Sequence, residues 1–158
     1  MAEIAVLLHN VRSSHNVGSI FRTADAAGVA KVFITGYTPR PTDRFGRRQK
    51  EIAKTALGAE SFISWEYASE PIPLLRRLRK DGWYIVGVEQ DPRAENYMRI
   101  RANKHIQKAL FVFGNEVRGL SRNVRDECDV LVEIPMRGKK ESLNVAVAAG
   151  IILFSINT

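Results

Sequence analysis

Residues 110–120 of the chain read Leu-Phe-Val-Phe-Gly-Asn-Glu-Val-Arg-Gly-Leu. Apolar side chains occupy successive positions up to Phe113 instead of alternating with polar ones, which is typical of a strand covered on both faces. Gly114 ends the apolar run, and polar residues follow it. The stretch predicts a buried strand of a central sheet with a polar turn at its carboxyl end, which is where open α/β sheets bind ligands.

Short apolar runs of the same kind, rich in Val, Ile and Phe, recur along the chain between helical patterns. We expect further strands at 4–8, 31–35, 62–65, 83–88 and 130–134, and helices at 17–27, 48–57, 72–80, 121–128 and 143–156. Gly28, Gly58 and Gly82 lie where these patterns predict helix stops. Strands that alternate with helices predict an α/β fold with a mainly parallel central sheet flanked by helices.

The composition is that of a globular protein. The chain has 158 residues, of which 45% are hydrophobic and 26% charged, so we expect one compact domain. Its longest apolar stretch, 145–154, is about half of the roughly 20 residues that cross a bilayer. The beginning of the chain shows no secretory signal. We therefore expect a cytoplasmic protein without a membrane span.

Several chemistries lack the required residue spacing. Cys128 is the single cysteine, and the three histidines are scattered without an H-E-x-x-H pattern, so we predict no disulfide framework and no metal site. The stretch around Gly138 and Lys139 lacks the earlier glycine of a phosphate-binding loop. Residues 114–119 do not form the G-x-G-x-x-G pattern of dinucleotide sites.

The charge balance favours a polyanionic partner. The formal net charge is +7, and a basic excess attracts nucleic acid. Residues 40–54 hold six basic and two acidic side chains, an excess of +4, and residues 99–108 form a second basic stretch without acids. Ordinary solvated surface is the alternative interpretation of such runs. RNA-phosphate contact is the functional one.

Two other junctions carry polar residues. Asn16 and Gly18 follow the first strand at the start of a helix, and Arg22 lies about one turn further on. Amide groups at a helix start can face a ligand or a phosphate. The plainer alternative is that Asn16 caps the helix and Arg22 forms a surface ion pair.

Late in the chain, a strand ends at Pro135, and Ser142 or Asn144 begins a helix rich in small residues. Its plainer interpretation is a capped helix docked on the core.

Taken together and in this order, the three stretches resemble the SPOUT superfamily of methyltransferases, and within it the SpoU or TrmH branch. The motifs are Asn16-x-Gly18-x-x-x-Arg22-Thr23, Gly114-Asn115-Glu116-x-x-Gly119-Leu120, and Ile134-Pro135-Met136 with Ser142-Leu143-Asn144. The resemblance implies transfer of a methyl group from S-adenosylmethionine to a ribose 2'-hydroxyl of tRNA or rRNA. It also implies a C-terminal deep trefoil knot that holds this cofactor, and a homodimer whose catalytic sites are completed across the interface.

The same resemblance assigns roles to individual residues. Arg22 would activate the hydroxyl, and the groups that order the site would be Asn16, Glu116, Ser142 and Asn144. The positions matched to the cofactor, or bordering its pocket, are Gly114, Ile134, Met136, Leu143, Val88, Glu89, Asn115 and Gly119. A guanidinium group keeps its proton at neutral pH, so literal base catalysis by Arg22 would need help, for example from an RNA phosphate. His15, beside the first motif, is the alternative base.

RNA capture is expected to depend on basic side chains, which contact phosphates without reading sequence. The candidates are Arg12, Arg40, Arg44, Arg47, Arg48 and Lys50.

The first motif begins close to the start of the chain, and the last predicted helix reaches nearly to its end, so we expect one SPOUT domain over 1–158 without an added RNA-binding domain. A noncatalytic RNA-binding or assembly protein with this fold, and methylation of a base nitrogen, are the open alternatives.

Overall fold

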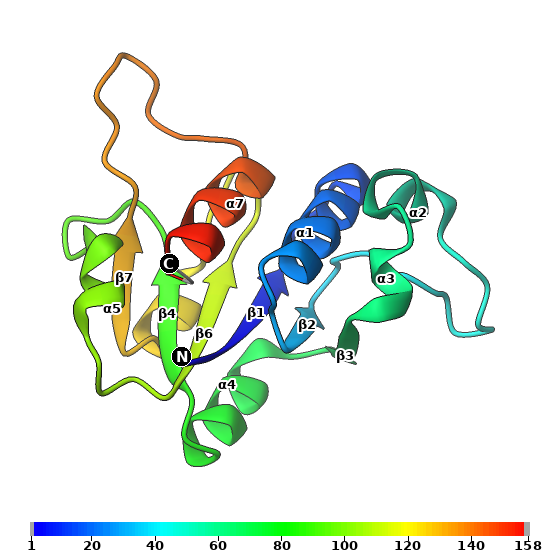
Figure 1. The fold of residues 1–158 in the computed structure, drawn as a ribbon, viewed down its shortest axis with the longest axis horizontal. Helices are drawn as coiled ribbons and strands as arrows, with labels where there is room; N and C mark the ends of the chain where they lie inside the picture. The colour runs from blue at the N-terminus through cyan, green and yellow to red at the C-terminus, as the bar shows by residue number, and fades with distance from the viewer. Residues whose placement is uncertain (1, 157–158) are drawn as a thin grey trace.

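A computed structural model describes residues 2–156, which form one sheet with helices packed against it (Figure 1). The strand order is β3-β2-β1-β6-β4-β7-β5, and all pairings between these strands are parallel. The strands are β1 Glu3–His9, β2 Lys31–Thr35, β3 Ser64–Ala68, β4 Tyr84–Val88, β5 Glu95–Asn96, β6 Lys108–Phe113 and β7 Val130–Glu133. The predicted parallel central sheet is confirmed.

Helices cover both faces of the sheet. They are α1 Ser14–Ala26, α2 Lys50–Ala56, α3 Ala59–Phe62, α4 Pro71–Lys80, α5 Met98–Ala102, α6 Arg122–Asp126 and α7 Val145–Ile156. Val6 and Leu8 of β1 pack in one core cluster with α1 and α7, whereas Leu7 packs in a second cluster with α4 and α6. Consecutive strand residues are therefore both buried, which explains the unbroken apolar runs. Within the described residues, none of the helices has the length and hydropathy to cross a membrane.

Most predicted elements are present with shifted ends, but the strand predicted at 62–65 is wrong at its start. Phe62 ends the short helix α3, and β3 begins only at Ser64. The left-handed conformations of Leu57 and Gly58 turn the chain after α2, and α3 then buries Ala59 and Glu60. Phe62 itself points outward and is 75% exposed, so apolar character alone gave a misleading prediction there.

The sequence patterns did not predict β5, α3 and α5. Strand β5 has two residues, both exposed, and α5 has five residues, so neither carries a periodic apolar pattern. The glycines predicted as helix stops, in contrast, behave as expected. Gly28 and Gly82 follow α1 and α4 with φ of 75° and 90°, and Gly58 follows the end of α2 with φ of 93°, a region that favours glycine.

Gly18 has a packing role instead of the ligand-facing role that the first motif suggested. It is buried inside α1, at the contact between α1 and α2. A Cβ atom at this position would lie 2.0 Å from Thr55 Oγ1 and 2.3 Å from the backbone oxygen of Ile52. The absence of a side chain therefore sets how closely the two helices approach.

Gly18→Ala is accordingly expected to lower the free energy of unfolding by about 3 kcal/mol, because the added methyl group overlaps with backbone that can only shift as a unit. Urea denaturation followed by circular dichroism measures this change. Gly150→Ala in α7 is the matched control, since a Cβ there meets only Thr23 Cγ2, at 3.8 Å. The control should keep or raise stability by up to about 1 kcal/mol; equal losses in both variants would contradict the packing role of Gly18.

Candidate active site

A cavity lies at the carboxyl ends of β4, β6 and β7, and residues from the segment 134–148 complete its wall. Figure 1 shows that the loop between β7 and α7 rises above this end of the sheet. The cavity is lined by every position matched to the cofactor: Val88, Glu89, Gly114, Asn115, Gly119, Ile134, Met136 and Leu143. Glu116 and Ser142, predicted as ordering groups, line it as well. The second and third motifs therefore meet at one cavity.

The charge of this cavity is opposite to that of the chain. Its charged side chains are the carboxylates of Glu89, Glu116 and Glu133, and none of the described residues that line it is Lys, Arg or His. Phe113, Ile134 and other apolar residues supply the rest of the wall. Carboxylates in a partly apolar pocket favour a ligand that carries positive charge, and they disfavour one that carries phosphates.

Backbone amides hold one of these carboxylates in place. Glu89 Oε2 accepts a hydrogen bond of 2.6 Å from the N–H of Leu120, and its Oε1 accepts one of 3.1 Å from the N–H of Gln90. Gly119 has a φ of 66°, and a Cβ on it would lie 2.1 Å from Glu89 Oε2. A Cβ on Gly114 would lie 2.7 Å from the carbonyl of Gly119. The two glycines therefore let the end of β6, the following turn and Glu89 touch one another.

The first motif joins the other two through hydrogen bonds. Glu116 accepts from the backbone N–H groups of Arg12 and Ser13, at 3.2 and 3.4 Å. Asn144 Nδ2 donates to Asn16 Oδ1 at 3.1 Å. All three motifs are thus connected at the same end of the sheet, although they are far apart in sequence.

The interpretation of Asn16 as a helix cap is wrong. Ser13 is the N-cap of α1, because its hydroxyl accepts from the N–H of Asn16 at 3.2 Å. Asn16 lies in the first helical turn and is buried, which leaves its side chain for the contact with Asn144. Asn144 Oδ1 accepts from the N–H groups of Ala146 and Val147. Of the two residues predicted to begin this helix, Asn144 is therefore the one that caps α7.

Arg22 lies apart from this cavity within one chain. It is exposed and lines a second cavity with His15, Thr55, Leu57 and Phe154, among others. Six positions separate it from Asn16, a rotation of about 240° around a helix with 3.6 residues per turn, so the two side chains leave α1 in different directions. Among residues 2–156 no ion pair of Arg22 is found, so the interpretation as a surface ion pair has no support.

The predicted RNA-binding residues differ in how they are held. Arg47 pairs with Asp43 at 2.7 Å, and Arg48 pairs with the buried Glu60 at 3.1 Å. Arg40 stacks over the ring of Tyr67, 4.1 Å from its centroid. Arg12, Arg44 and Lys50 are exposed. Arg48 thus has a structural partner that sequence alone did not indicate.

Cys128, the single cysteine, is held as a protonated thiol. Burial raises the pKa of the Cys128 thiol to about 12, and its Sγ donates to the carbonyl of Val124, so it stays protonated and unreactive near neutral pH. Within the part of the chain that the structure describes, no three His, Cys, Asp or Glu side chains are grouped so that they could hold a metal ion.

Sequence reasoning missed several residues that line the cavity. Glu133 ends β7, and Gln90 follows Glu89 after β4. The argument from carboxyl strand ends that selected Val88 and Glu89 applies to both of them. Phe113, Val117, Val145 and Ala148 also line the cavity, and no sequence signal distinguishes them from ordinary core or loop residues.

A single parallel sheet covered on both faces, with a carboxylate-lined cavity at its strand ends, defines an open α/β domain of the ligand-binding kind. The chain belongs to the SpoU rRNA Methylase family, whose sequence profile matches residues 3–154. A 23S rRNA (guanosine-2'-O-)-methyltransferase of Xanthomonas axonopodis pv. citri is 36% identical over 152 residues, which are 96% of this chain and 57% of that protein. The chain thus spans a little over half the length of this relative.

Solved structures agree with this assignment. An AdoMet-bound rRNA methyltransferase from Sinorhizobium meliloti superposes with a TM-score of 0.85 at 30% identity, covering 98% of this chain and 55% of that one. The TrmH/SpoU tRNA modifying enzyme of A. aeolicus superposes with a TM-score of 0.82 at 27% identity, covering 99% of this chain and 75% of that one.

Proposed function

We propose that the protein is an S-adenosylmethionine-dependent RNA methyltransferase that modifies a ribose 2'-hydroxyl of tRNA or rRNA. The observation that carries this proposal is the cavity at the ends of β4, β6 and β7. It gathers the matched cofactor residues and is acidic in a chain whose net charge is +7. Membership of the SpoU family and the names of its relatives support the same activity.

The residues present fit this cofactor. S-adenosylmethionine supplies a methyl group on a positively charged sulfur, together with an aromatic base. The three carboxylates of the cavity suit the positive charge, while Ile134, Leu143 and Val88 offer apolar surface to the base. Gly114 and Gly119 keep backbone close to the cavity, so main-chain groups can bind the ligand there. A basic, phosphate-binding pocket would have argued against this cofactor.

The motif residues would position the ribose. Methyl transfer needs the 2'-oxygen in line with the methyl group, and such positioning can contribute about 7 to 11 kcal/mol. The contact between Asn144 and Asn16 links the start of α7 to that of α1, and Glu116 fixes the backbone before α1. Ser142 lines the cavity directly. Arg22 would orient the ribose and stabilise the negative charge that develops on its oxygen as the hydroxyl proton leaves to solvent.

Because Arg22 does not line the cofactor cavity of its own chain, the proposal includes a homodimer in which each site is completed by the partner. Helices α1 and α7 lie side by side on one face of the sheet (Figure 1). Helix α7 exposes Val147 and Ile151 at 51% and 37%, next to the surface that holds Arg22. An apolar stripe beside a functional arginine supports burial of this surface between two copies.

Mixing two inactive variants tests the shared site. Arg22→Ala removes the guanidinium, and Gly119→Ala distorts the cavity, so each homodimer should be inactive. In a refolded equimolar mixture half of the dimers are mixed, and each mixed dimer keeps one site with both parts intact, so about a quarter of the wild-type activity should return. Failure of any activity to return, with mixed dimers verified by mass spectrometry, would show that each chain builds its site alone.

Two further features belong to the proposal. Family membership supports a C-terminal trefoil knot, and the segment 134–148 that would form it wraps the cavity. A cytoplasmic location fits an enzyme that acts on tRNA or rRNA.

The activity itself is tested by incubating the purified protein with cofactor labelled in its methyl group and with bulk tRNA or rRNA. Label should appear on ribose. Label on base atoms alone would assign a different methyl acceptor. If RNA binds but no label is transferred, the protein is a noncatalytic RNA-binding module.

A further inference from the structure

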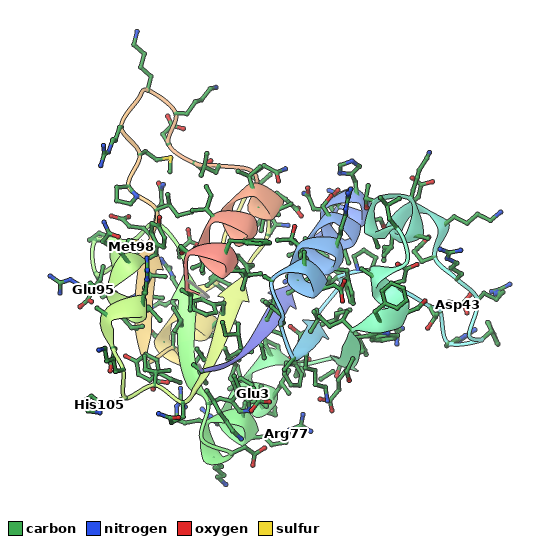
Figure 2. The ribbon with its side chains drawn as sticks, viewed as in Figure 1. Glu3, Asp43, Arg77, Glu95, Met98 and His105 are labelled. Atoms are coloured by element: carbon green, nitrogen blue, oxygen red, sulfur yellow. The ribbon has the colours of Figure 1, made fainter. Side chains whose placement is uncertain are left out.

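The segment between β2 and α2 projects from the body of the molecule beside α2 and α3 (Figure 1), and Figure 2 labels Asp43 at its outer end. Phe45 lies at the tip of this segment and is 67% exposed. An apolar ring on a projecting, otherwise polar turn does not contribute to the core. The ring is therefore available to a binding partner.

The turn that carries Phe45 is held rigidly. Asp43 Oδ1 accepts from the N–H groups of Phe45 and Arg47, at 2.8 and 2.9 Å. The backbone adds hydrogen bonds from Asp43 N–H to the Arg47 carbonyl and from Gly46 N–H to the Asp43 carbonyl. The hydrogen bond from the Arg47 amide is the largest of the contacts that lower the pKa of the Asp43 carboxyl group, so the carboxylate stays ionised near neutral pH. The backbone that carries Phe45 is thus held in a defined turn.

Two guanidinium groups lie close to the ring. Arg44 lies 4.8 Å and Arg47 5.1 Å from its centroid. Arg47 is fixed by its ion pair with Asp43, whereas Arg44 has no ion pair among residues 2–156. Arg44 is therefore free to turn toward a phosphate and uncover part of the ring for another flat group, while Arg47 stays paired with Asp43.

The same turn borders a recess that suits an anion. Its charged lining residues are Arg40, Arg47, Arg48 and Asp43, which are three guanidinium groups against one carboxylate. Arg48 is held there by the buried Glu60, and Arg40 by stacking on Tyr67. An aromatic ring beside a basic recess has the two elements that bind single-stranded nucleic acid, namely a surface for a base and a site for the backbone.

We propose that the turn 43–47 is a stacking site for an unpaired RNA base, with Phe45 as the ring against which the base packs and the neighbouring arginines as contacts for the flanking phosphates. The inference rests on the proposed function for its RNA partner. It adds that the substrate presents a single-stranded segment to this turn, since bases inside a duplex are already stacked and cannot reach the ring. The site would select RNA structure more than sequence, because every base has a flat face.

Binding of a short, unstructured RNA oligonucleotide carrying a fluorescent label tests the proposal. Phe45→Ala should weaken binding about tenfold and should leave binding of the matching duplex unchanged. Phe45→Trp should restore affinity, and oligonucleotide binding should quench its added fluorescence relative to wild type. The matched control is Phe62→Ala, which removes an equally exposed ring from α3 and should change affinity by less than about twofold.

A second measurement separates stacking from charge. Arg44→Gln should reduce the slope of log affinity against log salt by about 0.7, the loss of one contact between a cation and a single strand. Phe45→Ala should leave this slope unchanged. A lower slope in Phe45→Ala would mean that the ring acts only by placing arginines, which overturns the stacking site.

The remaining outcomes also distinguish the two proposals. If Phe45→Ala binds unstructured RNA like wild type while methyl transfer occurs normally, the stacking site is wrong and the proposed function stands. If wild type binds through Phe45 but transfers no methyl group, the stacking site stands and the proposed function is wrong. If Phe45→Ala instead changes the oligomeric state in sedimentation velocity, the occupant of the ring is a second copy, and the proposal is overturned.

Discussion

Arg22→Ala is expected to lower kcat for methyl transfer about a thousandfold, with little change in the affinity for S-adenosylhomocysteine. The physical reason is the place of Arg22: it lines a cavity different from the one that holds the matched cofactor residues. Removing it should leave the cofactor pocket intact but remove the group that is proposed to orient the ribose and stabilise its oxygen. The loss lies within the usual range for removing a donor that stabilises negative charge developing in the transition state.

Single-turnover kinetics and isothermal titration calorimetry give the two quantities that this prediction compares. Arg22→Lys is the informative second variant, because it keeps the charge but loses the planar, forked donor. We expect it to be nearly as inactive as Arg22→Ala. If the lysine variant kept most of the activity, Arg22 would act only as a positive charge. If the alanine variant kept it, His15, which lines the same cavity, would become the leading candidate.

The charge distribution would allow one small chain to bind both a cationic cofactor and a polyanion, as proposed. The cofactor cavity carries carboxylates without a basic residue in its described lining, whereas the basic side chains of the β2–α2 segment lie on the projecting part of the molecule. The β2–α2 segment thus attracts phosphates, whereas the carboxylates inside the cavity disfavour them. The ribose would have to reach the cavity while its phosphates are held elsewhere.

The parallel sheet was predictable because its cause is local. Each strand between two helical layers must be apolar at successive positions, and the runs at 32–34 and 110–113 show this directly. The cofactor cavity followed from the same information, because the carboxyl ends of parallel strands meet at one edge. This argument selected Glu89 and Asn115 as site residues, and it applies equally to Glu133.

Features that depend on distant partners could not be predicted from the sequence. Nothing near Asn16 indicates that its side chain contacts Asn144, which lies 128 positions later. From the sequence, Gly18 was interpreted as part of a ligand-facing helix start, because nothing in the neighbouring sequence indicates that α2 packs against it. The separation of Arg22 from the cavity, in contrast, follows from helical periodicity.

Gly119→Ala is expected to weaken binding of S-adenosylhomocysteine at least a hundredfold while the protein remains folded. Alanine is strained at the φ of 66° found here, a cost of about 1–3 kcal/mol, and its Cβ would lie 2.1 Å from Glu89 Oε2. Glu89 could move away only by giving up the amide of Leu120, whose N–H donates to it at 2.6 Å. Either this carboxylate or the turn 115–119 must therefore shift, and both line the cavity.

Calorimetric titration measures the loss of affinity, and thermal denaturation shows whether the fold is retained. Gly138→Ala is the matched control, because it lies in the loop between Met136 and Ser142, has no positive φ, and a Cβ there would meet no atom within 4 Å. The control should bind the ligand as wild type does. If Gly119→Ala also bound it normally, the contact between Glu89 and the turn would not shape the cofactor site, and the ligand would have to bind somewhere other than this acidic cavity.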